Sequence, residues 1–511
     1  MSDMKKRILR DAVIIAAAVG GLLWWFQYKR GNPNDGQEPK PVPVRPAEDT
    51  TWLTEPLYPD GTVNYIQPIN ARYRRGVMPR NNAAVDLLAI YAPRDLSDAD
   101  RELLARRMGL DSAPAPGAMP LYGFFGRQDN DEMDIVARRD LLKASAGPWS
   151  PQQLPKLSEY LDTYKRQLDR LVAASDKDHL FVPLYARSRP ERLVAAERPL
   201  AAFLAESTLA VMARATRSAG QEQFAAARKD IIAALRLCRL TSGSMVSYEA
   251  TAAYRDYQRM LEGAMVCLSA GNWPEDQARG LLDDIRSLPP MQPLLDTANW
   301  HLRLRDLDAM QVCAVDGLAR GMGLLSDQYE IQGLEDVGTN YNSAMRLINS
   351  WYDRRLRVLD VEDPARRRQV QQEIWKAWDS FRSDVDRRRY LKDGRLAPAD
   401  TVEVIVHLVV RSPLYLADYP RDSQVLARNM AIAAAALAAH KARHGRYPDS
   451  LEELTPGLLA EVPADPLGSG PLKYKPAGQT ALLYSVGYNR RDDDGREVLR
   501  EEMDDISLQM R

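Results

Sequence analysis

The chain has 511 residues, of which 45% are hydrophobic and 27% are charged. This length and composition predict two or three folded domains and exclude a mainly disordered chain. The 69 basic and 70 acidic side chains nearly cancel. The chain therefore lacks the excess of positive charge with which proteins attract nucleic acid, and no nucleic-acid partner is expected.

The N-terminal segment is predicted to anchor the chain in a membrane. Residues 12–26 form an uncharged apolar run, and with its flanks this run approaches the about 20 residues that a membrane-spanning helix needs. No small-x-small cleavage site follows, and Trp24, Trp25 and Tyr28 form an aromatic belt, as in a retained anchor. More basic residues precede the run than follow it, so residues 1–30 are predicted to be a cytoplasmic tip and a single transmembrane helix. In a bacterium the protein would be an inner-membrane protein with its bulk in the periplasm.

Residues 31–50 are predicted to form a linker. The stretch up to Asp49 is polar and contains five prolines, which favour an extended, semi-rigid spacer. Its PKPVPVRP sequence leaves one alternative open, a polyproline ligand for another protein.

Residues 51–425 are predicted to form a large helical region, and the sequence leaves open whether it is one domain or two. Apolar residues recur at three- and four-residue spacing, and helix-start signals occur at Ser97-Asp98, at Ser150-Pro151 (for a helix reaching about Ala174) and at Pro274. Four helices with very short links are expected between Pro199 and Leu288, so consecutive helices must pack antiparallel. Such helix pairs resemble tetratricopeptide-like solenoids without a clean repeat; an irregular bundle is the alternative.

One helix of this domain carries a polar stripe. Asn342, Arg346, Asn349 and Asp353 follow one another at spacings of four, three and four, which places them on one helix face. The stripe is a candidate partner-facing surface. The alternative is an internal hydrogen-bond network that holds neighbouring helices in register.

Residues 426–511 are predicted to form a small α+β module. A helix-like stretch from Ala427 to Leu454 leads into two short strands, about Leu472–Lys475 and Ala481–Val486, joined as a hairpin by PAGQ, and then into an acidic loop. This order of a long helix, GRYPDSLEEL, a hairpin and clustered carboxylates resembles the globular end of a major pseudopilin of type II secretion. The resemblance departs at the N-terminus, because MKKRILRDAVII lacks the prepilin peptidase site. Incorporation into a pilus through the usual stem helix is therefore not expected.

The pseudopilin resemblance implies a calcium site in the loop after the second strand. Carried over to this chain, the ligands are the Val486 carbonyl, Asn489 in place of the first carboxylate, and Asp504 and Asp505 as the later pair. The insertion 490–503 is longer than in pseudopilins, and its Asp492, Asp493 and Asp494 are candidate substitutes. Calcium accepts such a set, because it binds six to eight hard oxygens. Two alternatives stay open. One is an EF-hand loop in which residues 492–501 match positions three to twelve, weakened because Arg490 would be its first position; the other is a solvated acidic loop without metal.

A wider resemblance covers most of the chain. The helices from Ala201 to Leu288, the segment NSAMRLINSWYDRR and the segment DPLGSGPLKYKPAGQTALLYSVG resemble an uncharacterised family of bacterial membrane-anchored helical proteins with a pseudopilin-like end. The family implies a location and an architecture, and it implies no activity.

The side chains most often used in catalysis show no active-site motif. Cys238, Cys267 and Cys313 lie in apolar helical surroundings without metal or redox spacing, and buried thiols are expected, with one disulfide as the alternative. His440 and His444 have helical metal spacing, but no glutamate stands between them as in zincins, so dipole-facing surface histidines are expected. No catalytic or cofactor-binding residue is assigned.

The sequence therefore predicts a mainly α-helical, non-enzymatic membrane-anchored scaffold that binds proteins of the cell envelope, in connection with a secretion or pilus-like machine. The alternative is an envelope hydrolase, or another enzyme, whose site is formed from scattered residues of the helical domain.

Overall fold

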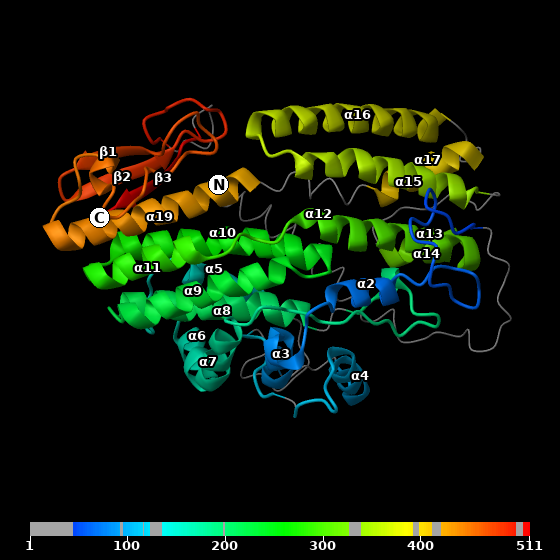
Figure 1. Ribbon diagram of the computed structural model, residues 1–511, viewed down its shortest axis with the longest axis horizontal. Helices are drawn as coiled ribbons and strands as arrows, with labels where there is room; N and C mark the ends of the chain where they lie inside the picture. The colour runs from blue at the N-terminus through cyan, green and yellow to red at the C-terminus, as the bar shows by residue number, and fades with distance from the viewer. Residues whose placement is uncertain are drawn as a thin grey trace.

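The structure is a computed structural model that describes residues 44–91, 96–115, 117–122, 135–197, 200–325, 339–391, 398–410, 421–496 and 504–511. Within these residues the chain is mainly helical with one small antiparallel sheet, as predicted (Figure 1). No helix in these ranges is long and apolar enough to span a membrane. The predicted anchor at residues 12–26 and most of the predicted linker lie outside the described residues.

Helices follow one another along most of the described chain. The α-helices are α2 (Ile66–Tyr73), α3 (Ala83–Ile90), α4 (Asp98–Met108), α5 (Ile135–Ser145), α6 (Pro155–Thr163), α7 (Lys165–Ala174), α8 (Ala201–Gly220), α9 (Phe224–Ser242), α10 (Ser247–Ala270), α11 (Glu275–Ser287), α12 (Leu294–Thr297), α13 (Leu304–Asp316), α14 (Leu318–Leu325), α15 (Tyr341–Leu356), α16 (Pro364–Leu391), α17 (Pro398–Val409) and α19 (Arg421–His444). Short 3₁₀ turns include η3 (Leu193–Ala195) and η6 (Leu451–Leu454), and a π-helical turn, η4 (Ala298–Arg303), precedes α13.

The four helices predicted between Pro199 and Leu288 are confirmed as α8 to α11. Their short links make neighbours pack closely, α8 with α9 and α9 with α10. A glycine lets α10 also approach α5: a Cβ atom added at Gly263 of α10 would lie 2.2 Å from the Ser145 carbonyl oxygen at the end of α5. Helix α19 then lies along α10 and α11 and buries Ala431 and the run Ala433–Ala439 (Figure 1).

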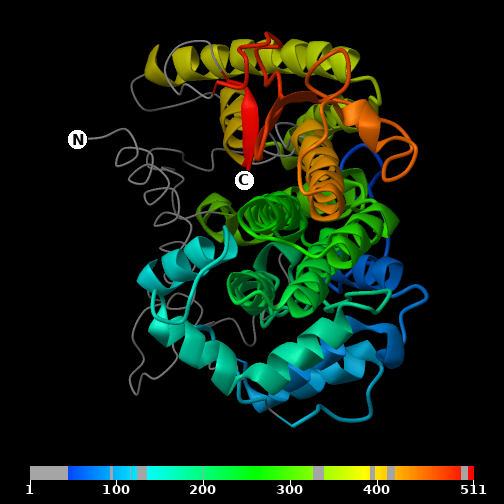
Figure 2. The same ribbon diagram turned by 90° about the vertical axis from the view of Figure 1, so that its left-hand side faces the viewer.

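Two large hydrophobic cores hold the described elements together. Helices α9 to α11 lie toward one end of the long axis and α13 to α17 toward the other (Figure 1). Seen along that axis, α16 and the strands lie at the top and α6 and α7 at the bottom (Figure 2). The first core joins α5 to α11 with α19 and the sheet. The second core joins α2, α4 and α12 to α17. The predicted boundary at residue 426 does not separate cores, because α19 and the strands share the first core with α8 to α11.

The sheet has the order β1-β2-β3, with β1 at Lys473–Ala477, β2 at Thr480–Ser485 and β3 at Ile506–Met510. The predicted hairpin is confirmed, because β1 and β2 pair antiparallel with Ala477 opposite Thr480. The third strand was not predicted. It pairs antiparallel with β2, Ser485 opposite Ile506, and packs on α10. The acidic loop is therefore held between two strands of one sheet.

The single helix predicted from Pro151 to about Ala174 is wrong. Residues 151–154 form a turn, α6 begins at Pro155, and Tyr164 interrupts the helix before α7 begins. Tyr164 has φ −102° and ψ 24°, outside the helical region.

Candidate functional site

The predicted polar stripe lies on α15 and binds the chain's own N-terminal strap, residues 44–52. The Arg45 amide donates to Asn342 Oδ1 at 2.8 Å. The Asn349 side-chain amide donates to the carbonyl oxygens of Asp49, at 3.1 Å, and Thr50, at 2.8 Å. Asn349 is only 7% exposed. Three hydrogen bonds from a helix face therefore fix the backbone of this segment to the body.

The outer edge of this contact is an ion pair, and its inner edge is buried. Arg346 Nε lies 2.6 Å from Asp49 Oδ2, with about half of each side chain exposed. Thr50 and Thr51 are fully buried. Trp52 packs edge-on against Trp300 with ring centroids 5.4 Å apart. The strap is thus part of the second core rather than the free end of a spacer.

The fourth residue of the stripe, Asp353, forms an ion pair with Arg303 of η4. The Arg303 guanidinium also stacks over the rings of Trp52 and Tyr352. All four stripe residues therefore make contacts within the chain. Asn342, Arg346 and Asn349 contact the strap, almost 300 residues earlier, rather than a neighbouring helix, and only Asp353 contacts a neighbouring helical turn.

The acidic loop follows β2, and two of its carboxylates accept main-chain amides. Asp504 accepts the amides of Tyr488 and Asn489 at 2.9 to 3.2 Å. Asp505 Oδ2 accepts those of Asp493 and Gly495 at 3.0 and 2.8 Å. Each of these carboxylates accepts hydrogen bonds from two main-chain amides of the loop, which would otherwise need partners of another kind. These side chains hold the loop's shape.

The side chains of the other candidate ligands have partners of their own. Asp492 lies 3.6 Å from the Lys473 ammonium, and Asp494 lies 2.7 Å from that of Lys475, both on β1. The Val486 amide donates to Asp465 Oδ2 at 3.0 Å, and the Asn489 amide group donates to Asp493 at 2.9 Å.

One carboxylate oxygen next to the loop, Asp505 Oδ1, is left open to accept a hydrogen bond or a cation. Asp505 is fully buried, and its Oδ1 has no hydrogen-bond partner among the described residues. Burial is the main cause that raises the pKa of Asp505, because a desolvated carboxylate disfavours its charge. Within the described ranges, however, no three acidic, histidine or cysteine side chains are arranged to hold a metal. The described residues thus supply one open oxygen, whereas calcium takes six to eight.

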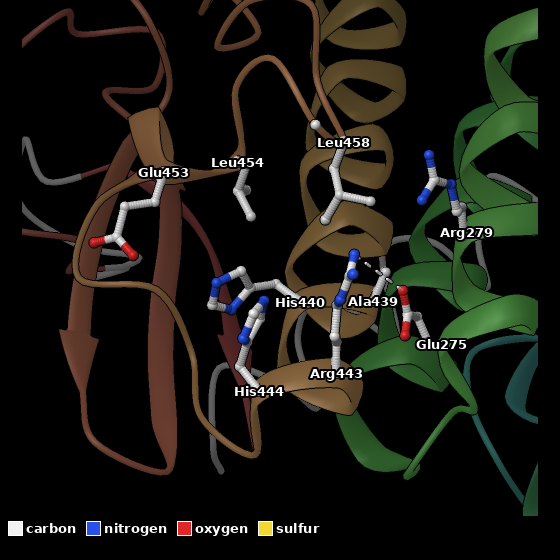
Figure 3. Close-up of a pocket in the computed structure, with 10 residues that line it drawn as sticks. Glu275, Arg279, Ala439, His440, Arg443, His444, Glu453, Leu454 and Leu458 are labelled. Atoms are coloured by element: carbon white, nitrogen blue, oxygen red, sulfur yellow. Dashed lines mark ion pairs between the residues drawn. The ribbon is translucent and has the colours of Figure 1, made fainter.

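A pocket of about 130 Å³ opens where α19 ends (Figure 3). His440 and His444 lie one helical turn apart, with ring centroids 4.3 Å from each other. Glu275 and Arg279 of α11 form one wall, and Leu454 and Leu458 form another. Burial lowers the pKa of His440. The spacing of the two histidines was visible in the sequence, whereas the residues of α11 and of the segment around Leu454 that complete the pocket are brought there by the fold.

A second feature that the sequence did not show joins Ser247 to His301. Ser247 Oγ lies 3.0 Å from His301 Nδ1, and the Ser247 amide also points at that nitrogen from 3.4 Å. Both residues are buried. His301 therefore caps the start of α10. The three cysteines are free and buried, as predicted.

Comparisons with family models, with curated proteins and with solved structures find no match to this chain. The function proposed below therefore rests on the chain's own residues.

Proposed function

We propose that the protein is a membrane-anchored scaffold that holds a rigid helical platform in the bacterial periplasm and binds proteins of the cell envelope, in connection with a secretion or pilus-like machine. The observation that carries the proposal is the docked strap. A platform held by a single anchor needs its tether tied into the folded body. The strap, residues 44–52, is fixed to α15 by hydrogen bonds between its main chain and the side chains of Asn342 and Asn349. Thr50 and Thr51 of the strap are also fully buried.

The effective linker is shorter than the sequence suggests. It ends at residue 43 rather than at residue 50, because Val44 is already 5% exposed within the second core. Residues 31–43 span at most about 45 Å when fully extended. The body is therefore kept within this reach of the expected membrane surface, and its α15 side is where the tether arrives.

Membrane fractionation tests the anchor. The full chain is expected in the membrane fraction after alkaline carbonate washing, and a variant that lacks residues 1–30 is expected in the supernatant. A protease added to spheroplasts should degrade the body and spare the N-terminal tip. A full chain that washes off the membrane would overturn the proposal.

Cross-linking in intact cells, followed by capture of the full chain, tests the platform. The same envelope proteins should be captured repeatedly with the full chain and lost with a truncated chain that ends at residue 50. Hydrolysis of an envelope substrate by the purified full chain, without any recurring partner, would favour the enzymatic alternative instead.

A further inference from the structure

The pocket at the end of α19 contains two imidazole rings on one helix face. Residues four apart on a helix are neighbours on its surface, and the rings of His440 and His444 are 4.3 Å apart. Figure 3 shows both rings side by side, with Glu453 on one side and Arg443 and Glu275 on the other. Two imidazoles at this spacing are ligands that a zinc, nickel or copper ion accepts.

A hydrogen bond fixes the ring nitrogen that His440 can offer. His440 Nδ1 lies 3.2 Å from the Arg446 carbonyl oxygen. A carbonyl oxygen only accepts, so Nδ1 must carry the proton and Nε2 of the neutral ring carries the lone pair. Metal-binding histidines are oriented in the same way, by donating their other nitrogen to a carbonyl or carboxylate. The Arg446 carbonyl therefore presets His440 as an Nε2 ligand.

The surroundings favour a cation at this place. Both histidines lie in the last turns of a 24-residue helix, whose C-terminal carbonyls carry partial negative charge. Glu453 and Glu275 line the same pocket. Two cations, Arg279 and Arg443, line it as well. Arg443 is directed to Glu275, with 3.7 Å between Nη1 and Oε1. The positive charge that would repel a metal is partly neutralised.

We propose that His440 and His444 bind one divalent transition-metal ion of the zinc class. His440 Nε2 is the preset ligand, His444 is the second ligand, and water fills the remaining positions. The described residues supply two protein ligands rather than a closed set of four, so the site is open to solvent. An open site of this kind suits metal-dependent attachment of a partner's side chain to the end of α19. It does not depend on the acidic loop or on the anchor.

Isothermal titration of zinc into the detergent-solubilised full chain, with any polyhistidine tag removed, tests the site. We expect one equivalent of zinc at micromolar affinity, weakening at least tenfold between about pH 7.5 and pH 5.5 as the imidazoles protonate. His440→Ala/His444→Ala should lose this binding while keeping the wild-type melting temperature in the absence of zinc. The matched control is His179→Ala, which removes a histidine far from the pocket and should bind zinc as the wild type does.

Three results would overturn the proposal. The first is binding by the wild type at millimolar zinc only. The second is unchanged binding by the double variant. The third is loss of zinc binding in Asp505→Asn with retention in the double variant, because that pattern would place the ion in the acidic loop. If the double variant melts at a lower temperature without zinc, the single variant His444→Ala carries the test, because His444 is exposed.

Discussion

Removal of the Asn349 side chain is predicted to release the strap without unfolding the body. The side-chain amide donates two hydrogen bonds to strap carbonyls, at 3.1 and 2.8 Å, from a residue that is 7% exposed. A hydrogen bond contributes about 1 kcal/mol net, so Asn349→Ala should weaken docking by about 2 kcal/mol. Since about 1.36 kcal/mol corresponds to a factor of ten, the population of the undocked strap should rise about thirtyfold.

Hydrogen exchange followed by mass spectrometry measures this opening directly, because strap amides such as Thr50 and Trp52 are bonded within the segment. Their exchange should accelerate about thirtyfold in Asn349→Ala, while α8 to α11 exchange as in the wild type. Arg346→Ala is the matched control. Its ion pair with Asp49 is about half exposed and is worth at most about 1 kcal/mol. Equal acceleration in both variants, or none in Asn349→Ala, would refute the assignment of docking to Asn349.

Three further predictions concern packing, pH and calcium. Gly263→Ala should lower the melting temperature, because its Cβ would meet the Ser145 carbonyl oxygen at 2.2 Å, whereas Gly323→Ala in α14, with nothing within 4 Å, should leave it unchanged or slightly higher. Burial raises the pKa of Glu206 from 4.5 to about 7, so its contribution to stability is complete below pH 4.5 and is lost as the pH rises through 7. Thermal melts from about pH 5 to pH 8 should therefore show a decline that Glu206→Gln lacks. The calcium site that the pseudopilin resemblance implies is tested in the same way: a loop that binds calcium must melt at a higher temperature in millimolar calcium than in chelator and must lose this rise in Asp505→Asn. Identical melting in calcium and chelator would contradict that expectation.

The parts of the fold that the sequence predicted are those set by local signals. Helices α8 to α11 follow from apolar periodicity and from the helix stop and start signals at Gly220, Gly271 and Pro274. The β1-β2 hairpin follows from its short link. Strand β3 was missed because its formation depends on pairing with β2 across a loop of about 20 residues. The break at Tyr164 was missed because periodicity continues through it.

The candidate sites show the same division between local and distant information. The stripe on α15 was visible from residue spacing, but its partner is the strap almost 300 residues away, and no local pattern contains that pairing. The His440 and His444 spacing was likewise visible. The carbonyl that fixes the tautomer and the walls from α11 come from the fold. Spacing on one helix therefore identifies candidate side chains, and tertiary contacts decide what those side chains do.

Helix α10 joins the two hydrophobic cores and thereby links the strap to the C-terminal strands. Its N-terminal end belongs to the second core through Ala250 and the preceding Val246, and its later turns belong to the first core through Tyr257 and Leu268. The strap docks in the second core, and β3 and α19 pack on α10 in the first. One continuous helix of 24 residues is about 36 Å long. The core that holds the strap and the core that holds β3 and α19 are therefore joined by one continuous helix, and under the proposed function a partner bound at the end of α19 would be held at a fixed distance from the strap.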